Sequence, residues 1–234
     1  MAKTDLDEYD FSSFAGLNGR LVEWRYQGLA KYFRGEHCLE LGSSDGQGTE
    51  YLAKAFWKVV AVDGSHKAVE ELRRNFGGRN VTVMEAYFED LALDARFDTI
   101  MMAHILEHVD SPAAVIEVAK RHLAPGGVMI ADVPNALSIH RQVGVALGMI
   151  EKVTDLNDAD RSIGHQRVYT PERFRHEFEQ AGLTIYEFGG FMIKSLSNGQ
   201  MEQWFDEPLT KALFDIGTKY PEIAAEMYIV AGLS

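Results

Sequence analysis

The sequence predicts an α/β fold with a doubly wound, mostly parallel sheet, and three observations carry this prediction. Short apolar runs alternate with helical patterns between residues 37 and 133. The runs are almost continuously apolar, which is typical of strands buried on both faces of a parallel sheet. A glycine loop with Gly42, Gly46 and Gly48 joins the first run to a helical pattern. We expect a last run, residues 227–231, to add an antiparallel strand.

The individual elements follow from apolar spacing and from residues that begin or end helices. Ser111-Pro112 and Thr170-Pro171 each place a capping hydroxyl before a proline, which is typical of a helix start. Pro125-Gly126-Gly127 predicts a turn before the fifth strand. The expected strands cover residues 37–41, 58–62, 81–84, 97–103, 128–133, 183–188 and 227–231. The expected helices cover residues 17–33, 48–55, 66–76, 112–122, 138–150, 171–181 and 209–219.

Composition narrows the class of protein. The 234 residues fit one domain, and a net charge of −12 without a dense Lys/Arg run argues against a nucleic-acid partner. The single cysteine, Cys38, excludes an internal disulfide framework. We see no leader peptide and no apolar run of membrane length, so we expect a cytoplasmic protein without a membrane partner. The sequence does not predict an oligomeric state.

The glycine loop and a downstream aspartate indicate a nucleoside ligand. Backbone N–H groups at such a loop, with a helix N-terminus behind them, suit a polar ligand. Asp63 ends the second strand, where a carboxylate can accept hydrogen bonds from ribose hydroxyls. A dinucleotide fingerprint starting at Gly42 would need glycine where the chain has Ser44 and Gln47. We therefore expect a nucleoside without a pyrophosphate.

Several segments together resemble the class I S-adenosylmethionine-dependent methyltransferases. Residues 39–46 (LELGSSDG) resemble the first motif of that family, and residues 60–63 (VAVD) resemble the second. Residues 85–91 resemble the segment around the adenine, residues 97–109 the fourth motif, and residues 123–127 the turn before the fifth strand. The resemblance implies a Rossmann-like fold, with S-adenosylmethionine as cofactor and S-adenosylhomocysteine as product.

The resemblance also implies which residues surround the cofactor. The glycine loop would pass the methionine part and the ribose, Asp63 would hold the ribose hydroxyls, and Tyr87 and Phe88 would lie beside the adenine. The cofactor-binding residues implied in this way are Glu40, Gly42, Ser43, Ser44, Asp45, Gly46, Asp63, Gly64, Tyr87, Phe88, Ala103 and His104.

His104, Glu107 and His108 form an H-x-x-E-H string directly after the fourth strand. A zinc peptidase needs such a string on an uninterrupted helix, and here a new helix begins only at Ser111-Pro112. The string also resembles the E-x-x-E-H segment of ubiquinone-biosynthesis O-methyltransferases, where these side chains bind a divalent ion. With a histidine in place of the first glutamate, we expect no metal here.

The acceptor side is predicted from residues that follow the fourth and fifth strands. His104 lies just past a strand end, so it is our first candidate for a general base, and His165 is the second. His165, Arg167 and Tyr169 alternate and would share a face of an extended chain. The expected substrate-binding residues are Tyr26, His108, Asn135, His140, Arg141, Arg167 and Tyr169.

These expectations combine into one hypothesis. The chain would be a single methyltransferase domain with an N-terminal helical cap (1–35), a cofactor-binding core (36–134), a lid or substrate insertion (135–170) and a C-terminal part of the sheet (171–234). It would methylate a hydroxyl or an amine of a small-molecule acceptor, with the hydroxyl as the first choice. The alternatives are an NAD-dependent oxidoreductase and a non-catalytic S-adenosylmethionine-binding protein.

Overall fold

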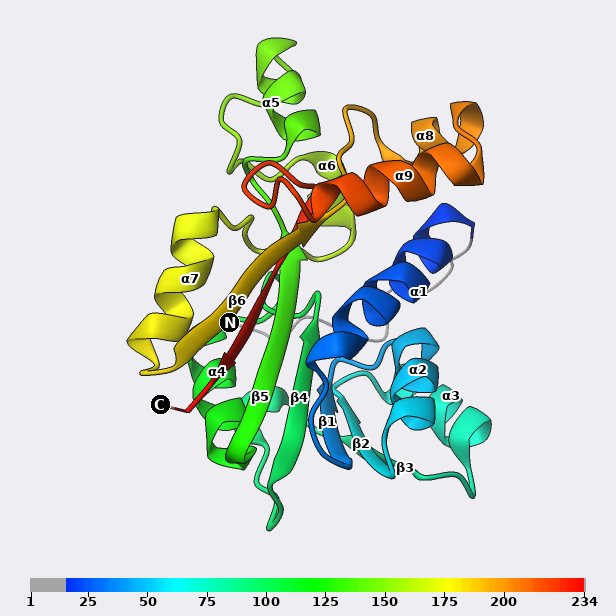
Figure 1. The fold of residues 1–234 in the computed structure, drawn as a ribbon, viewed down its shortest axis with the longest axis vertical. Helices are drawn as coiled ribbons and strands as arrows, with labels where there is room; N and C mark the ends of the chain where they lie inside the picture. The colour runs from blue at the N-terminus through cyan, green and yellow to red at the C-terminus, as the bar shows by residue number, and fades with distance from the viewer. Residues whose placement is uncertain (1–15, 234) are drawn as a thin grey trace.

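The computed structural model describes residues 16–233 and contains one seven-stranded sheet in the order β3-β2-β1-β4-β5-β7-β6 (Figure 1). Strands β1 to β5 are parallel, while β7 pairs antiparallel with both β5 and β6. The predicted fold class, with its antiparallel last strand, is therefore confirmed. The strands are β1 (His37–Leu41), β2 (Lys58–Asp63), β3 (Val81–Glu85), β4 (Phe97–Ala103), β5 (Leu123–Pro134), β6 (Thr184–Phe191) and β7 (Glu226–Gly232).

Helices cover both faces of the sheet and one of its ends. The α-helices are α1 (Leu17–Leu29), α2 (Gln47–Ala55), α3 (His66–Phe76), α4 (Pro112–His122), α5 (Ile139–Ala146), α6 (Asp158–Ser162), α7 (Pro171–Gln180), α8 (Asn198–Trp204) and α9 (Glu207–Gly217). Two short 3₁₀ segments are η3 (Ala30–Tyr32) and η4 (Phe88–Asp90). Helix α1 forms most of residues 16–35 of the expected N-terminal cap, and residues 1–15 of the cap lie outside the described part of the chain.

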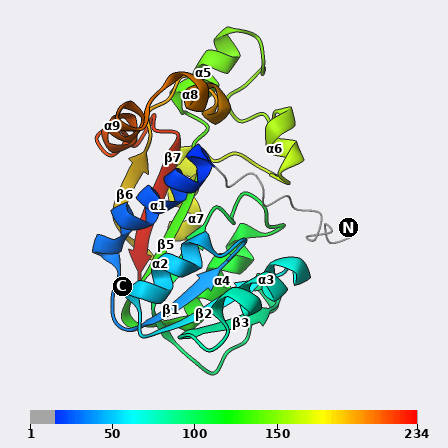
Figure 2. The same cartoon turned by 90° about the vertical axis from the view of Figure 1, so that its right-hand side faces the viewer.

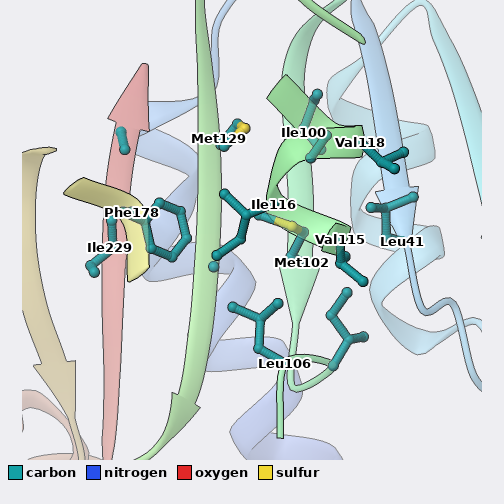
Figure 3. Close-up of a cluster of buried hydrophobic side chains, with 14 of the residues drawn as sticks. Leu41, Ile100, Met102, Leu106, Val115, Ile116, Val118, Met129, Phe178 and Ile229 are labelled. Atoms are coloured by element: carbon teal, nitrogen blue, oxygen red, sulfur yellow. The ribbon is translucent and has the colours of Figure 1, made fainter. Parts of the chain in front are cut away.

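The two-residue period of the strands sends alternate side chains to opposite faces of the sheet. One face carries Ile100, Met102 and Met129 against α4 and α7, and Figure 3 shows this cluster with Ile116 of α4 and Phe178 of α7. The opposite face packs against α1, α2 and α9. Because Glu40 of β1 and Asp132 of β5 fall on that second face, two buried carboxylates lie beneath α1.

The carboxyl end of the sheet is where the remaining elements gather. Strand β5 ends at Pro134, and antiparallel β7 begins beside it with Glu226. The insertion with α5 and α6 follows β5, and these two helices lie with α8 and α9 at one end of the molecule (Figures 1 and 2). The topology thus brings Glu226, from the last strand of the sequence, to the edge of the sheet where the glycine loop lies.

Three local expectations were wrong. The expected turn at Pro125-Gly126-Gly127 lies within β5, where Gly126 adopts a φ of 77° and the register with β4 shifts. Glycine tolerates this left-handed conformation, so the strand passes through an irregularity instead of ending. The helix expected over residues 138–150 ends at Ala146, and the unpredicted helix α8 begins at Asn198.

Among residues 16–233, the structure contains no helix that is both long and apolar enough to span a lipid bilayer.

Candidate active site

The glycine loop turns the chain sharply between β1 and α2. Gly42 and Gly46 adopt φ values of 82° and 85°, which glycine reaches without steric cost. Ser44 is left-handed as well, with a φ of 49°, although it carries a side chain. The Gly42 N–H donates to the Val62 carbonyl at 2.9 Å, so the loop begins in register with β2.

Asp63 holds this loop in place from the end of β2. Its Oδ2 accepts hydrogen bonds from the backbone N–H groups of Ser43 at 3.0 Å and Ser44 at 2.9 Å. Its Oδ1 accepts from the Ser65 N–H at 2.9 Å. The carboxylate therefore fixes the backbone of the loop, and the predicted bonds to ribose hydroxyls would be additional to these contacts.

Glu40 and Tyr26 lie beneath the loop, on the sheet face that α1 covers. Glu40 is buried, and its carboxylate accepts hydrogen bonds from the Thr49 hydroxyl at 2.6 Å and the Tyr26 hydroxyl at 3.2 Å. Burial raises the pKa of Glu40 to about 7, although both hydrogen bonds act in the opposite direction. These contacts join α1, β1 and α2 below the glycine loop.

The Glu40→Gln variant tests this buried carboxyl through pH. Because the folded pKa lies above the ordinary value of 4.5, the carboxyl favours folding most below pH 4.5, and this contribution is lost as pH rises through about 7. We expect the free energy of unfolding of the wild type, relative to Glu40→Gln, to fall by about 3 kcal/mol over this range. Urea denaturation from pH 4.5 to 8 measures this difference.

A matched control comes from helix α2. Glu50 is exposed and pairs with Arg79 and Lys54, which lower its pKa. The Glu50→Gln variant should therefore show a pH dependence of opposite sign. A pH-independent difference between wild type and Glu40→Gln would contradict the assignment of a raised pKa to Glu40.

The other implied cofactor residues line the same edge of the sheet. Tyr87 is 38% exposed, and the Phe88 ring lies close to Gly42. Ala103 is partly buried at the end of β4, and Gly64 follows Asp63. Asp45 accepts hydrogen bonds from the backbone and side chain of Gln47, the first residue of α2.

The loop also contains polar groups that suit a bound ligand. The Oγ atoms of Ser43 and Ser44 are buried and have no hydrogen-bond partner within residues 16–233. Buried hydroxyls are normally paired, so these two atoms indicate a polar group absent from the isolated chain. A nucleoside cofactor with hydroxyl, amine and carboxylate groups fits this loop.

A second site lies where β4, β5 and β7 meet, centred on His104. Its Nδ1 lies 2.9 Å from Glu107 Oε1, and its Nε2 lies 3.0 Å from Asp132 Oδ2. Glu226 Oε2 is 3.7 Å from the same Nε2. The His104 side chain is 27% exposed, whereas Asp132 and Glu107 are fully buried.

Arg25 of α1 completes this group, which we call the His104 cluster (Arg25, His104, Glu107, Asp132 and Glu226). Arg25 Nε lies 3.0 Å from Asp132 Oδ2, and Arg25 Nη2 lies 2.9 Å from Glu226 Oε2. Arg25 itself is only 7% exposed. Buried charges of both signs are thus interleaved, as a low-dielectric site requires.

The electrostatics of the cluster keep His104 charged. Burial and the Arg25 charge oppose protonation, but Asp132 and Glu107 raise the pKa of His104 well above its ordinary value. Burial likewise opposes ionisation of Glu107, yet His104 lowers the pKa of Glu107 to about 2. An imidazolium between two carboxylates cannot accept a further proton, which argues against the general-base role expected for His104.

A chain of ion pairs runs from this cluster into the insertion. Glu107 Oε1 is 3.9 Å from His165 Nε2, and His165 Nδ1 is 3.4 Å from Asp160 Oδ1. Asp160 Oδ2 in turn accepts from Arg141 Nη1 at 3.0 Å. His165, the second expected base, is therefore held between two carboxylates and linked to α5 and α6.

Two groups of side chains at this end are close enough to hold a cation. His104, Asp132 and Glu226 form one group, but Arg25 already supplies its positive charge. Glu107, His108 and His165 form the other, and burial lowers the pKa of His108 to about 4, which leaves that ring neutral. A neutral imidazole and a carboxylate are ligands that divalent ions accept.

A cavity of about 1280 Å³ lies between the insertion and the segment of residues 195–200. His140, Arg141 and Arg167, three of the expected substrate-binding residues, are among the residues that line it. Arg167 also donates to the Leu106 and Val109 carbonyls, so it supports the turn after β4. The cavity lies beside the His104 cluster rather than over the glycine loop.

The structure places the other expected substrate residues differently. Tyr26, Asn135 and Tyr169 are buried, and protein groups satisfy their polar atoms. Asn135 Nδ2 donates to the Glu222 and Ala224 carbonyls, and Tyr169 donates to Glu177 at 2.8 Å. His108 contacts the His165 ring at a centroid distance of 4.7 Å.

Arg25, Asp132 and Glu226 were not predicted as site residues. One signal was available in the sequence. Asp132 interrupts an otherwise apolar strand, and a carboxylate in a strand that is buried on both faces of the sheet needs a charged or hydrogen-bonding partner. The partners themselves lie 107 residues before and 94 residues after it in the chain, so the sequence pattern alone does not pair them.

Comparison with known families gives a consistent result. A model described as a methyltransferase domain matches residues 17–187. The cypemycin N-terminal methyltransferase of a Streptomyces species is 30% identical over 171 residues, covering 68% of this chain and 69% of its own. The ubiquinone biosynthesis O-methyltransferase of Paramagnetospirillum magneticum is 27% identical over 182 residues, covering 74% and 70%. A probable S-adenosylmethionine-dependent methyltransferase of Mycobacterium tuberculosis (H37Rv) is 30% identical, but this match spans only 41% of its length and 48% of this chain.

Solved structures share the fold. An S-adenosylmethionine-dependent methyltransferase from Mesorhizobium loti superposes with a TM-score of 0.65 at 16% identity, covering 90% of this chain and 97% of that one. The glycopeptide N-methyltransferase MtfA, complexed with S-adenosylmethionine, superposes with a TM-score of 0.61 at 14% identity, covering 90% and 86%.

Proposed function

Since the chain belongs to the S-adenosylmethionine-dependent methyltransferases, we propose that it methylates a nitrogen of a small-molecule acceptor bound at the His104 cluster. The sequence favoured a hydroxyl over an amine, whereas the contacts of His104 support the nitrogen acceptor proposed here. The observation that carries the proposal is that both His104 ring nitrogens lie within 3.0 Å of carboxylate oxygens.

Cofactor and acceptor would occupy neighbouring parts of the same edge. Bound S-adenosylmethionine supplies a methyl group already activated on a sulfonium sulfur. The loop from Gly42 to Gly46, shaped by Asp63, would hold it at the ends of β1 and β2. His104, at the end of β4, lies between that loop and the ends of β5 and β7. The protein then has to align the acceptor and exclude water.

The charges of the cluster suit a nitrogen acceptor. A neutral amine uses its lone pair to form the bond to the methyl carbon as the methyl–sulfur bond breaks. The nitrogen becomes positively charged in this step and loses a proton afterwards, and nearby carboxylates stabilise that charge. Glu226 is the most accessible carboxylate of the cluster, with its side chain 15% exposed. A hydroxyl acceptor instead needs a base to remove its proton, and the protonated His104 ring does not supply one.

Similar proteins are compatible with this choice. Among them, the cypemycin methyltransferase and MtfA are named for methylation of an N-terminus and of a glycopeptide nitrogen. The relative from ubiquinone biosynthesis is named as an O-methyltransferase. A hydroxyl acceptor is therefore the second candidate.

Matched pairs of probes distinguish the two acceptors. We expect the purified chain with S-adenosylmethionine to release S-adenosylhomocysteine with primary arylalkyl amines such as 2-phenylethylamine, and not with the corresponding alcohols. Glu226→Gln should reduce kcat/KM for the amines at least ~10-fold, because it removes a carboxylate facing the developing charge. Mass spectrometry identifies the methylated atom.

Glu222→Gln is the control, because Glu222 is an exposed carboxylate near the start of β7 that pairs with Arg175. Its kcat/KM should match that of the wild type. Turnover of the alcohols without the amines, or full activity of Glu226→Gln, would contradict the proposal.

A further inference from the structure

The cavity beside the His104 cluster is larger than the reacting end of an acceptor requires. Its volume of about 1280 Å³ exceeds the roughly 300–1,000 Å³ of usual small-ligand pockets. The insertion supplies one wall, and residues 195–200 supply the facing wall. The cavity therefore has space for a part of the acceptor that takes no part in the chemistry.

The wall from α5 and the turn after it is apolar. Val143, Leu147 and Met149 line the cavity with side chains that are 36%, 70% and 76% exposed. Val143 and Leu147 are four residues apart, so the helical period places them on one face. Large apolar side chains gathered at a cavity are typical of a ligand-binding surface.

The polar part of the lining has an excess of positive charge. Four arginines line the cavity with only two aspartates, Asp155 and Asp158, in a chain of net charge −12. Within the described residues, the exposed Arg161 guanidinium donates to the Leu156 carbonyl at 3.1 Å, which leaves other donors for a ligand. Positive charge here complements an anionic group.

Side-chain interactions connect both walls of the cavity to the His104 cluster. On the insertion side, Arg141 lines the cavity and connects to it through Asp160, His165 and Glu107. On the facing side, Ser195 lines the cavity, and the adjacent Lys194 interacts electrostatically with Glu226. The cavity lining is therefore connected to the proposed acceptor site through intervening side chains on both walls.

We infer that this cavity binds the non-reacting part of the acceptor, an apolar segment against the α5 wall that ends in an anionic group near Arg161. The inference rests on the proposed function, since it places the reacting nitrogen at the His104 cluster. It narrows the substrate class to amphipathic acids that carry a nucleophilic nitrogen.

Two probes of equal chain length test this inference without cofactor or methyl transfer. We expect calorimetric titration to show that octanoate binds the wild-type chain and that octan-1-ol binds more weakly. Leu147→Gln should weaken both probes ~10-fold through lost apolar contact. Arg161→Gln should weaken octanoate ~10-fold, the size of one charge-assisted hydrogen bond, and leave octan-1-ol unchanged. Leu209→Gln, on α9 outside the cavity lining, should leave both affinities unchanged.

The residues changed are exposed, so the variants should unfold at the wild-type temperature. Absence of octanoate binding, or equal binding by wild type and Leu147→Gln, would overturn the inference. If Arg161→Gln left octanoate binding unaffected, this would contradict the inference that the anionic group of the acceptor lies near Arg161. Because these titrations contain no amine and no cofactor, they can fail while amine methylation succeeds, and the reverse.

Discussion

We expect the Arg25→Met variant to lose about 3–5 kcal/mol of unfolding free energy, because the substitution removes one of the two cationic side chains that pair with Asp132 and Glu226. Arg25 bridges Asp132 at 3.0 Å and Glu226 at 2.9 Å, and Asp132 is fully buried. Methionine fills a similar volume, so the loss reports charge rather than a cavity. Urea denaturation at neutral pH measures it.

Two further variants make this result specific. Arg74→Met on the exposed surface of α3 should change stability by no more than about 0.5 kcal/mol. Adding Glu226→Gln to Arg25→Met should recover part of the lost stability, because it removes one of the unpaired charges. A loss for Arg25→Met no larger than that for Arg74→Met would show that the cluster does not hold α1 to the sheet.

The second large effect is expected at the glycine loop. Asp63→Ala removes the acceptor for the Ser43 and Ser44 N–H groups and should weaken S-adenosylhomocysteine binding at least ~100-fold. Without these bonds, the loop keeps its backbone bond from Gly42 to Val62 of β2 but loses the two contacts that fix Ser43 and Ser44 in the conformation that exposes their backbone to a ligand. Calorimetric titration of wild type and variant measures the affinity.

Asp98→Ala is the matched control for this prediction. Asp98 also accepts two backbone hydrogen bonds, from Glu36 and His37, but it does so at the opposite end of the parallel strands. We expect the variant to bind S-adenosylhomocysteine with wild-type affinity. Equal losses for Asp63→Ala and Asp98→Ala would mean that the effect comes from general destabilisation.

The parallel core was predictable because its strands repeat one simple pattern. β1 and β4 begin and end at the predicted residues, since each is an apolar run bounded by charged or glycine-rich segments. The irregular parts of the fold were not predictable from the sequence. Glycines in β5 look like a turn in sequence but are accommodated at a register shift, and α8 is a seven-residue helix that contains Gly199 and begins with a capping box at Ser197 and Gln200.

The candidate site also has one part that the sequence predicted and one part that it did not. The glycine loop and Asp63 lie close together in sequence and carry a recognisable motif, so the sequence located them. The His104 cluster depends on α1 crossing the sheet face that carries Asp132, and on β7 returning antiparallel to bring Glu226 beside Pro134. Neither event has a local signature, and this is why His104 was predicted as a base while its partners were not.

One calorimetric comparison tests the proposal that S-adenosylmethionine binds at the glycine loop. We expect S-adenosylhomocysteine to bind the wild-type chain with one-to-one stoichiometry, NAD⁺ to give no binding heat, and the Asp63→Ala variant to lose the S-adenosylhomocysteine signal. Binding of NAD⁺ in place of S-adenosylhomocysteine, or full binding by Asp63→Ala, would contradict it.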